Sequence, residues 1–127
     1  MFSHVTIGSN DLAKAKPFYD ELVKPLGLVR HLDFPTAAGY GPPDGRPQLW
    51  VLSPLDQKAA SVGNGITIAL EADNRGAVDA VYKAAMSAGA KDEGAPGLRS
   101  HYHPDYYGAY VRDLDGNKIC VVCHKKP

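Results

Sequence analysis

The feature that most constrains the fold is a weak internal repeat. The segment His4-Val-Thr-Ile lies 63 positions before Thr67-Ile-Ala-Leu, and the same offset takes Asp11 to Asn74. In both halves an apolar strand comes first, a helix follows, and further strands close the half. Repetition of this kind indicates that one supersecondary unit is used twice along the chain.

The spacing of apolar residues predicts two helices, at about Asp11–Lys24 and Asn74–Ala88. A capping side chain opens each helix, and Gly27 and Gly89 follow at the two C-termini. Pro17 lies inside the first helix and is expected to kink or delay it. The apolar runs predict strands at Phe2–Gly8, Gln48–Leu52, Gly65–Leu70, Gly108–Arg112 and Lys118–Cys123, with weaker strands around Leu28–Phe34 and Gly39–Gly41.

Length and charge narrow the class of protein. The 127 residues suit one domain, with one module at about 1–58 and a second at about 63–127. Fourteen basic and 14 acidic side chains give a net charge of zero, which argues against nucleic acid or an acidic membrane as a partner. No stretch approaches the roughly 20 apolar residues of a membrane span. The N-terminus lacks a signal-peptide pattern, so we expect a cytoplasmic protein.

Alternation along the strands sorts their side chains onto two faces. One face is wholly apolar and should pack on the helices: Val5, Ile7, Leu49, Val51, Ile66, Ile68, Ile119 and Val121. The other face is mixed: His4, Thr6, Gln48, Trp50, Thr67, Tyr110, Arg112, Cys120 and Val122. This second set is too polar for a core and too aromatic for a plain solvated surface. We interpret it as the lining of a pocket, in preference to a solvated face with one stray Trp.

Several short motifs follow one another in a specific order: His4, Asp11, Phe18-Tyr19-Asp20, Leu26-Gly27-Leu28, Gly65-Ile-Thr-Ile-Ala and Arg112-Asp-Leu-Asp-Gly-Asn-Lys-Ile. Together with the segment 101–110, they resemble the vicinal oxygen chelate superfamily of glyoxalase I, bleomycin-resistance proteins and extradiol dioxygenases, and its glyoxalase-like subgroup. The resemblance covers nearly the whole chain. It implies an α+β fold in which two βαβββ modules form a curved mixed sheet around a cleft. It also implies a homodimer that completes the cleft.

The same resemblance implies four inward-facing metal ligands, on the first, fourth, fifth and eighth strands. His4 matches the first position, and the fourth-strand position falls at Gln48 or Trp50. Thr67 and Cys120 stand at the other two positions. A divalent ion needs about three protein ligands. The set is therefore incomplete: His4 and Gln48 remain the candidate metal ligands, and no cofactor is expected.

Two further features suggest ligand contacts. His101 and His103 lie in a segment that we interpret as a loop over the cleft, with a chelating pair as the alternative. Arg112 is either an anion-binding group of the pocket or a solvated charge of the last hairpin.

The C-terminal strand contains Cys120-Val-Val-Cys123-His124, which has the C-x-x-C-H spacing of haem attachment. Residues three apart on a strand point to opposite faces, so neither haem attachment nor a redox pair is expected. His124, like His31, shows no partner in the sequence and is expected at the surface.

Two functions stay open. The favoured one is a glyoxalase-like protein that binds a small aromatic or anionic molecule and has a degenerate metal site. Its candidate ligand-binding residues are Trp50, Thr67, Tyr110, Arg112, Cys120, His101 and His103. The alternative is a metal-dependent lyase of the lactoylglutathione lyase kind, or a dioxygenase, that uses His4 and non-standard ligands.

Overall fold

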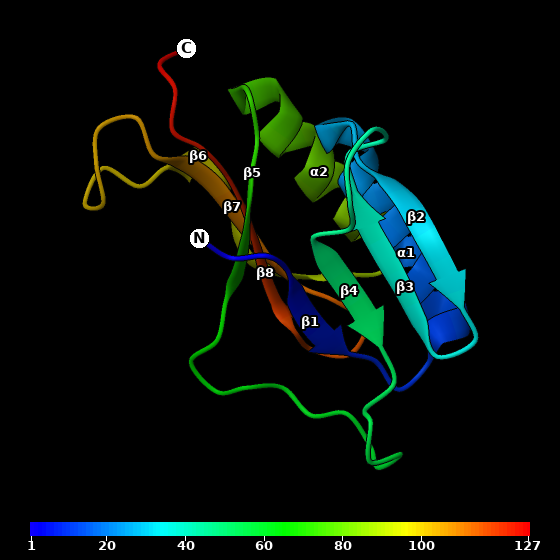
Figure 1. Cartoon of the computed structure of the whole chain (residues 1–127). Coiled ribbons are helices and arrows are strands. Elements are labelled where there is room, and N and C mark those ends of the chain that lie inside the picture. The colour runs from blue at the N-terminus through cyan, green and yellow to red at the C-terminus, as the bar shows by residue number, and fades with distance from the viewer.

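The computed structural model describes residues 1–127 and contains two four-stranded mixed sheets (Figure 1). The N-terminal sheet has the order β1-β4-β3-β2, and the C-terminal sheet has the order β5-β8-β7-β6. In each sheet the strands that come first and last along the chain pair in parallel, β1 with β4 and β5 with β8. The other pairs are antiparallel. The strands are β1 (Val5–Gly8), β2 (Val29–Phe34), β3 (Ala37–Gly41), β4 (Leu49–Leu52), β5 (Ile68–Glu71), β6 (Lys91–Leu98), β7 (Tyr107–Arg112) and β8 (Lys118–Cys123).

One helix follows the first strand of each sheet, namely α1 (Leu12–Val23) and α2 (Arg75–Ser87). Asp11 and Asn74 cap them by accepting hydrogen bonds from the backbone N–H groups of Lys14 and Ala77. Pro17 lies inside α1 without ending it. A short 3-10 turn, η1 (Lys24–Leu26), follows α1, and Gly27 then takes the left-handed conformation, with φ of 73°.

The repeat found in the sequence is present in three dimensions. β1 begins at residue 5 and β5 at residue 68, and the helices begin at residues 12 and 75, so both pairs are separated by 63 positions. The two modules of strand, helix and three strands confirm the expected α+β fold class.

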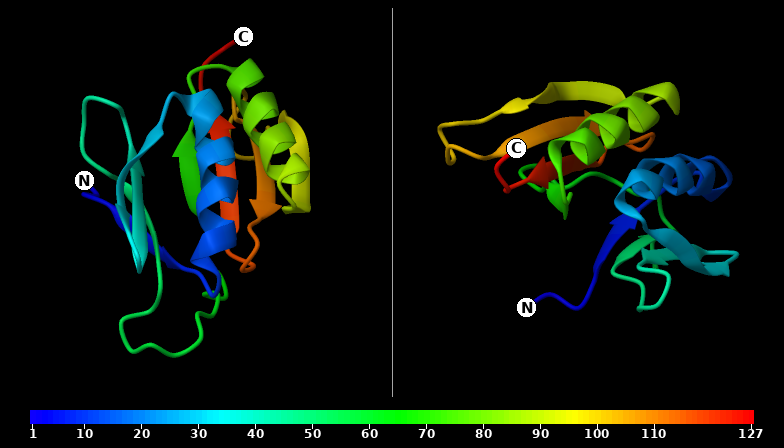
Figure 2. Two further views of the ribbon diagram at one scale, coloured as in Figure 1. Left: turned by 90° about the vertical axis from the view of Figure 1, so that its right-hand side faces the viewer. Right: turned by 90° about the horizontal axis from the view of Figure 1, so that it is seen from above.

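The helices lie between the two sheets, as Figure 2 shows from above. Helix α2 packs on β6, β7 and β8, helix α1 packs on the strands of the N-terminal sheet, and the two helices contact each other. One cluster of buried side chains joins all of these layers. We call the sheet face that is turned away from the helices the outer face. The outer faces of the two sheets therefore do not face each other within one chain.

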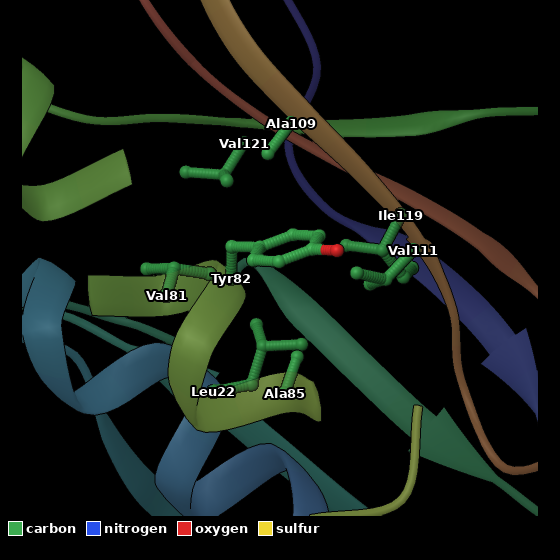
Figure 3. A pocket seen from close by; sticks show the side chains of 8 residues that line it. All are labelled: Leu22, Val81, Tyr82, Ala85, Ala109, Val111, Ile119 and Val121. Carbon is green, nitrogen blue, oxygen red and sulfur yellow. The ribbon is translucent and has the colours of Figure 1, made fainter. Parts of the chain in front are cut away.

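A small gap remains where the layers meet. It measures about 10 Å³ and is lined only by apolar and aromatic side chains, which point toward one another in Figure 3. They come from α1 (Leu22), α2 (Val81, Tyr82 and Ala85), β7 (Ala109 and Val111) and β8 (Ile119 and Val121). A space of this size is about one water probe and has no polar partner, so it belongs to the core and is not a ligand site.

The expected strands differ most from the observed ones in three places. The strand expected from Gly65 begins at Ile68, because residues 63–66 form a turn in which the Ile66 N–H donates to the Gly63 carbonyl. Ile66 therefore lies outside the sheet and is exposed, against the expectation that it joins the apolar face. The first strand likewise begins at Val5 and not at Phe2. Strand β6 was not expected at all, because its sequence KDEGAPGL combines charges, glycines and a proline.

No helix of the structure combines the length and the apolar character that crossing a membrane requires.

Candidate functional site

The outer face of the C-terminal sheet carries a cleft of about 490 Å³. Tyr110 on β7 and Cys120 on β8 are directly paired in the sheet and form its floor. Their neighbours Val111 and Val121 point the other way, into the core, as strand alternation requires. The lining consists of Thr67, Ala69, Tyr102, His103, Tyr106, Tyr110, Lys118, Cys120 and His124.

Hydrogen bonds tie the floor of this cleft together. The Tyr106 and Tyr110 hydroxyls lie 2.8 Å apart, and the Tyr106 hydroxyl also lies 3.6 Å from the Cys120 Sγ. Burial raises the pKa of the Cys120 thiol, although the hydrogen bonds to the two tyrosines lower it in part. Burial is also the main cause that raises the pKa of Tyr106. All three groups are therefore neutral near pH 7, and Cys120 lacks the thiolate character of a nucleophile.

One wall of the cleft is an aromatic cluster. Its rings form a row in which each ring contacts the next. The distances between ring centroids are 4.3 Å for His101 and Tyr102, 4.9 Å for Tyr102 and Tyr106, and 5.4 Å for Tyr106 and His124. His103 stacks on His124, and their ring nitrogens Nε2 and Nδ1 lie 2.8 Å apart. His124 is exposed, as expected, but it has a partner that the sequence did not reveal, because β8 ends beside the loop. His31 also has a partner, the carbonyl of Pro42.

Two cations flank the ring of Tyr110. The Arg99 guanidinium carbon lies 5.6 Å from the ring centroid, and the Lys118 Nζ lies 5.4 Å from it. Lys118 belongs to the motif of the last hairpin, but neither cation was among the ligand-binding residues expected from the sequence. Arg112 was among them, and it donates from Nε to Glu93 at 2.9 Å and from Nη1 to the Gly116 carbonyl. Because Glu93 neutralises it, the arrangement favours the hairpin-charge interpretation of Arg112.

The remaining candidate residues lie elsewhere. His4 and Gln48 line a groove of about 650 Å³ between the edges of β1 and β5, and Thr67 and Ala69 border both this groove and the cleft. Trp50 lies on the outer face of the N-terminal sheet, where its ring stacks on Phe34 at 6.5 Å. The structure therefore brings Thr67, Tyr110, Cys120 and His103 together in one cleft. Within one chain it does not bring Trp50 there.

The sheet registers decide which residue of β4 corresponds to Cys120. Trp50 pairs with Thr6, and Cys120 pairs with Ala69, which is Thr6 shifted by the repeat of 63. Trp50 is therefore the equivalent of Cys120, while Gln48 corresponds to Lys118. The four positions at which the resemblance implies metal ligands therefore carry His4, Trp50, Thr67 and Cys120.

These four side chains do not fit a divalent metal ion. An indole N–H is a donor only and has no lone pair for a metal, and a neutral threonine hydroxyl is a poor ligand. The pKa of the Cys120 thiol is raised, which opposes the thiolate form that metals bind. The chain also contains no group of three or more His, Cys, Asp or Glu side chains placed to hold an ion.

Two βαβββ modules and a cleft on the outer face of a mixed sheet define the class of glyoxalase-fold proteins. Residues 1–121 match the glyoxalase/bleomycin resistance protein/dioxygenase superfamily, and the chain belongs to this superfamily.

Solved structures agree with this assignment. A glyoxalase/bleomycin resistance protein from Albidiferax ferrireducens T118 is 36% identical with a TM-score of 0.86, and the match covers 100% of this chain and 99% of that one. A family enzyme from Burkholderia phytofirmans PsJN is 22% identical (TM-score 0.72, 97% and 98% covered). A lactoylglutathione lyase from Agrobacterium tumefaciens is 21% identical (TM-score 0.65, 97% and 92% covered). The last two show the fold alone. No curated protein matches the chain.

Proposed function

We propose that this protein binds a small aromatic molecule in the cleft of the C-terminal sheet, without a divalent metal. The observation that carries the proposal is the cleft itself, whose volume of about 490 Å³ falls within the range of small-molecule sites. Three tyrosines and two histidines supply ring faces and a few polar groups, which is the usual composition of such sites.

Binding of a neutral fluorescent naphthylamine, N-phenyl-1-naphthylamine, tests this proposal. We expect saturable binding with one site per chain. Ala69 borders the cleft and is exposed, so Ala69→Trp fills the cleft without disturbing the core and weakens binding about tenfold or more. Ala59→Trp adds the same side chain at an exposed position outside the cleft and is the matched control. Equal affinity of the two variants would contradict the proposal.

The alternative is a metal-dependent lyase or dioxygenase that uses His4. Such enzymes need a metal to stabilise charge on the substrate and a base to move a proton. The residues at the four family positions disfavour it, since only His4 is a good metal ligand and none is a carboxylate. Elemental analysis of the purified protein distinguishes the two functions. Zinc, nickel, manganese or iron near one per chain, lost in His4→Ala, would support the enzyme.

We also infer a homodimer in which two copies complete each cleft. The outer face of the N-terminal sheet exposes Leu32 and Phe34 next to Trp50, an apolar surface that a second copy would cover. Because the two outer faces point away from each other, this surface can reach the cleft of the C-terminal sheet only on another chain. Light scattering at micromolar concentration should give twice the mass of the chain. A monomeric wild type would contradict the inference, and so would a Phe34→Asp variant that stays dimeric.

A further inference from the structure

We propose that the cleft selects ligands that carry a negative charge. Lys118 and Arg99, the two cations beside the Tyr110 ring, provide this selectivity. The inference rests on the proposed function, since it concerns the ligand class of the same cleft. It assigns a role to two cations that were not expected as ligand contacts from the sequence, although Lys118 belongs to the motif of the last hairpin.

Arg99 is held in place by the backbone of β6. Its Nη1 donates to the Gly97 carbonyl and its Nη2 to the Ala95 carbonyl, both at 2.9 Å. A Cβ on Gly94 would lie 2.9 Å from the Arg99 Nη2, and one on Gly97 would lie 3.3 Å from Nη1. The two glycines therefore leave the strand surface bare, so that the guanidinium lies on it beside Tyr110. Both acceptors are neutral, and three of the five N–H donors remain free.

Lys118 approaches Tyr110 from the strand on its other side. It is the first residue of β8 and has the same parity as Cys120, so its side chain lies on the outer face and lines the cleft. Its ammonium contacts the Tyr110 ring, and neither it nor Arg99 takes part in any of the seven ion pairs of the chain.

The cleft offers no internal partner for these charges. No Asp or Glu is among its lining residues. The nearby acid Glu93 is bound to Arg112, and Asp105 is paired with Arg75. Lys118 lines the cleft, and Arg99 lies outside the lining but beside the Tyr110 ring of its floor. These two uncompensated cations create a positive potential at the cleft, which favours a negative ligand.

The ring surfaces beside the cations specify the rest of the ligand. Tyr102 is 61% exposed and lies 4.9 Å from Tyr106, so a planar ligand can stack on it. The ligand class that satisfies both features is an aromatic ring bearing a carboxylate, sulfonate or phosphonate group. A cation–π contact with Tyr110 keeps both cations next to the position of that group.

Two probes with one ring system test the inference. The anion 8-anilinonaphthalene-1-sulfonate differs from the neutral N-phenyl-1-naphthylamine by a single sulfonate. We expect Lys118→Gln and Arg99→Gln each to weaken binding of the anion about tenfold, as for the loss of one charge-assisted hydrogen bond. Binding of the neutral probe should change less than twofold. Lys118→Arg, which keeps the charge, should retain the affinity for the anion, and Lys83→Gln on the exposed side of α2 is the control.

Each other outcome overturns a defined part of this account. Equal losses for both probes would mean that the cations act only on structure, and the charge inference would fall while the proposed function stands. If the neutral probe binds and the anion does not, the charge inference also falls while the proposed function stands. If neither probe binds, or if Ala69→Trp has no effect on either, the proposed function fails and the inference falls with it. Circular dichroism of each variant verifies that it is folded.

Discussion

At the scale of single residues, the buried carboxylate Asp113 connects the two halves of the chain. It follows β7, is 5% exposed, and accepts hydrogen bonds from the backbone N–H groups of Asp115 and Asn117 and from the Asn117 amide. The hydroxyl of Tyr19 on α1 also donates to it. A buried carboxylate is tolerated only when its oxygens are satisfied in this way. The last hairpin thereby anchors the first helix.

We predict that Tyr19→Phe lowers the free energy of unfolding by about 1–3 kcal/mol near pH 7, because Asp113 loses a buried donor. Burial, and then the charge of Asp113, raise the pKa of Tyr19 well above its ordinary value of 10.0. The stabilisation is therefore complete below pH 10.0 and is lost as the pH rises above it, where Tyr19 ionises in the unfolded chain first.

Urea unfolding of both proteins from about pH 9 to about pH 11 checks this prediction. The free energy of unfolding of the wild type should fall more steeply than that of Tyr19→Phe, so that the difference between them shrinks. The other tyrosines titrate in both proteins and cancel. A difference that stays constant over this range would contradict the assigned coupling.

At the scale of elements, the loop between β6 and β7 is closed by a pair of histidines. The Nδ1 of His103 accepts from the Asp105 backbone N–H at 3.1 Å, so its Nε2 carries the proton and donates to the His124 Nδ1. This hydrogen bond and the stacking of the two rings join the loop to the residue that follows β8. The aromatic wall of the cleft therefore depends on a contact between segments that are 21 positions apart.

We predict that His124→Ala loosens this loop and leaves the rest of the fold unchanged. Amide hydrogen exchange should accelerate in residues 100–106, because the loop loses both the hydrogen bond and the stacked ring. Exchange in α1 should stay as in the wild type. Lys126→Ala, an exposed substitution two residues further on, is the control and should change neither region. Unchanged exchange in the loop would show that the pair does not hold it.

At the scale of the whole molecule, the two modules share a core through the helices between the sheets. Leu22 of α1 has no exposed surface and lies beside Val81 and Ala85 of α2 and beside Ile119 of β8 (Figure 3). A side chain of the first module thus fills space at the sheet of the second. We therefore expect the two halves to unfold together.

We predict that Leu22→Ala destabilises the protein by about 2–5 kcal/mol, since it enlarges a gap that is already present. Leu55→Ala is a matched control at a side chain that is 99% exposed, with an expected change within about 0.5 kcal/mol. Unfolding of Leu22→Ala by tyrosine and Trp50 fluorescence and by circular dichroism should give one coincident transition. Two separate transitions would show that the modules unfold independently.

The sequence was most informative where alternation is regular. The parity of β4, β7 and β8 predicted that Leu49, Val51, Ile119 and Val121 face the core and that Tyr110 and Cys120 share the other face. Strand β6 was not predicted, because glycines and a proline are more typical of a loop than of a strand. Those same glycines make room for Arg99, so the residue and its setting were missed together.

The rest of the site depends on contacts between distant segments and on strand register, which a single sequence does not reveal. His103 meets His124 because β8 returns along β7, and a local pattern carries no sign of this contact. The choice between Gln48 and Trp50 required the pairing of β4 with β1, since a shift of register cannot be read from composition. Trp50 and Cys120 have the same strand parity but lie in different sheets, because the helices separate the sheets.

The order of the strands also determines how copies of this protein can add to one another. The distant edges, β2 and β6, are interrupted by register shifts, and β6 begins with Lys91, Asp92 and Glu93 and contains Pro96. These features keep a further strand from pairing with an exposed edge. β1 and β5 lack such shifts and are each paired on one side only. We therefore expect any association through strand edges to use β1 and β5, in the middle of the molecule, where two copies can close on each other and do not extend into a fibre.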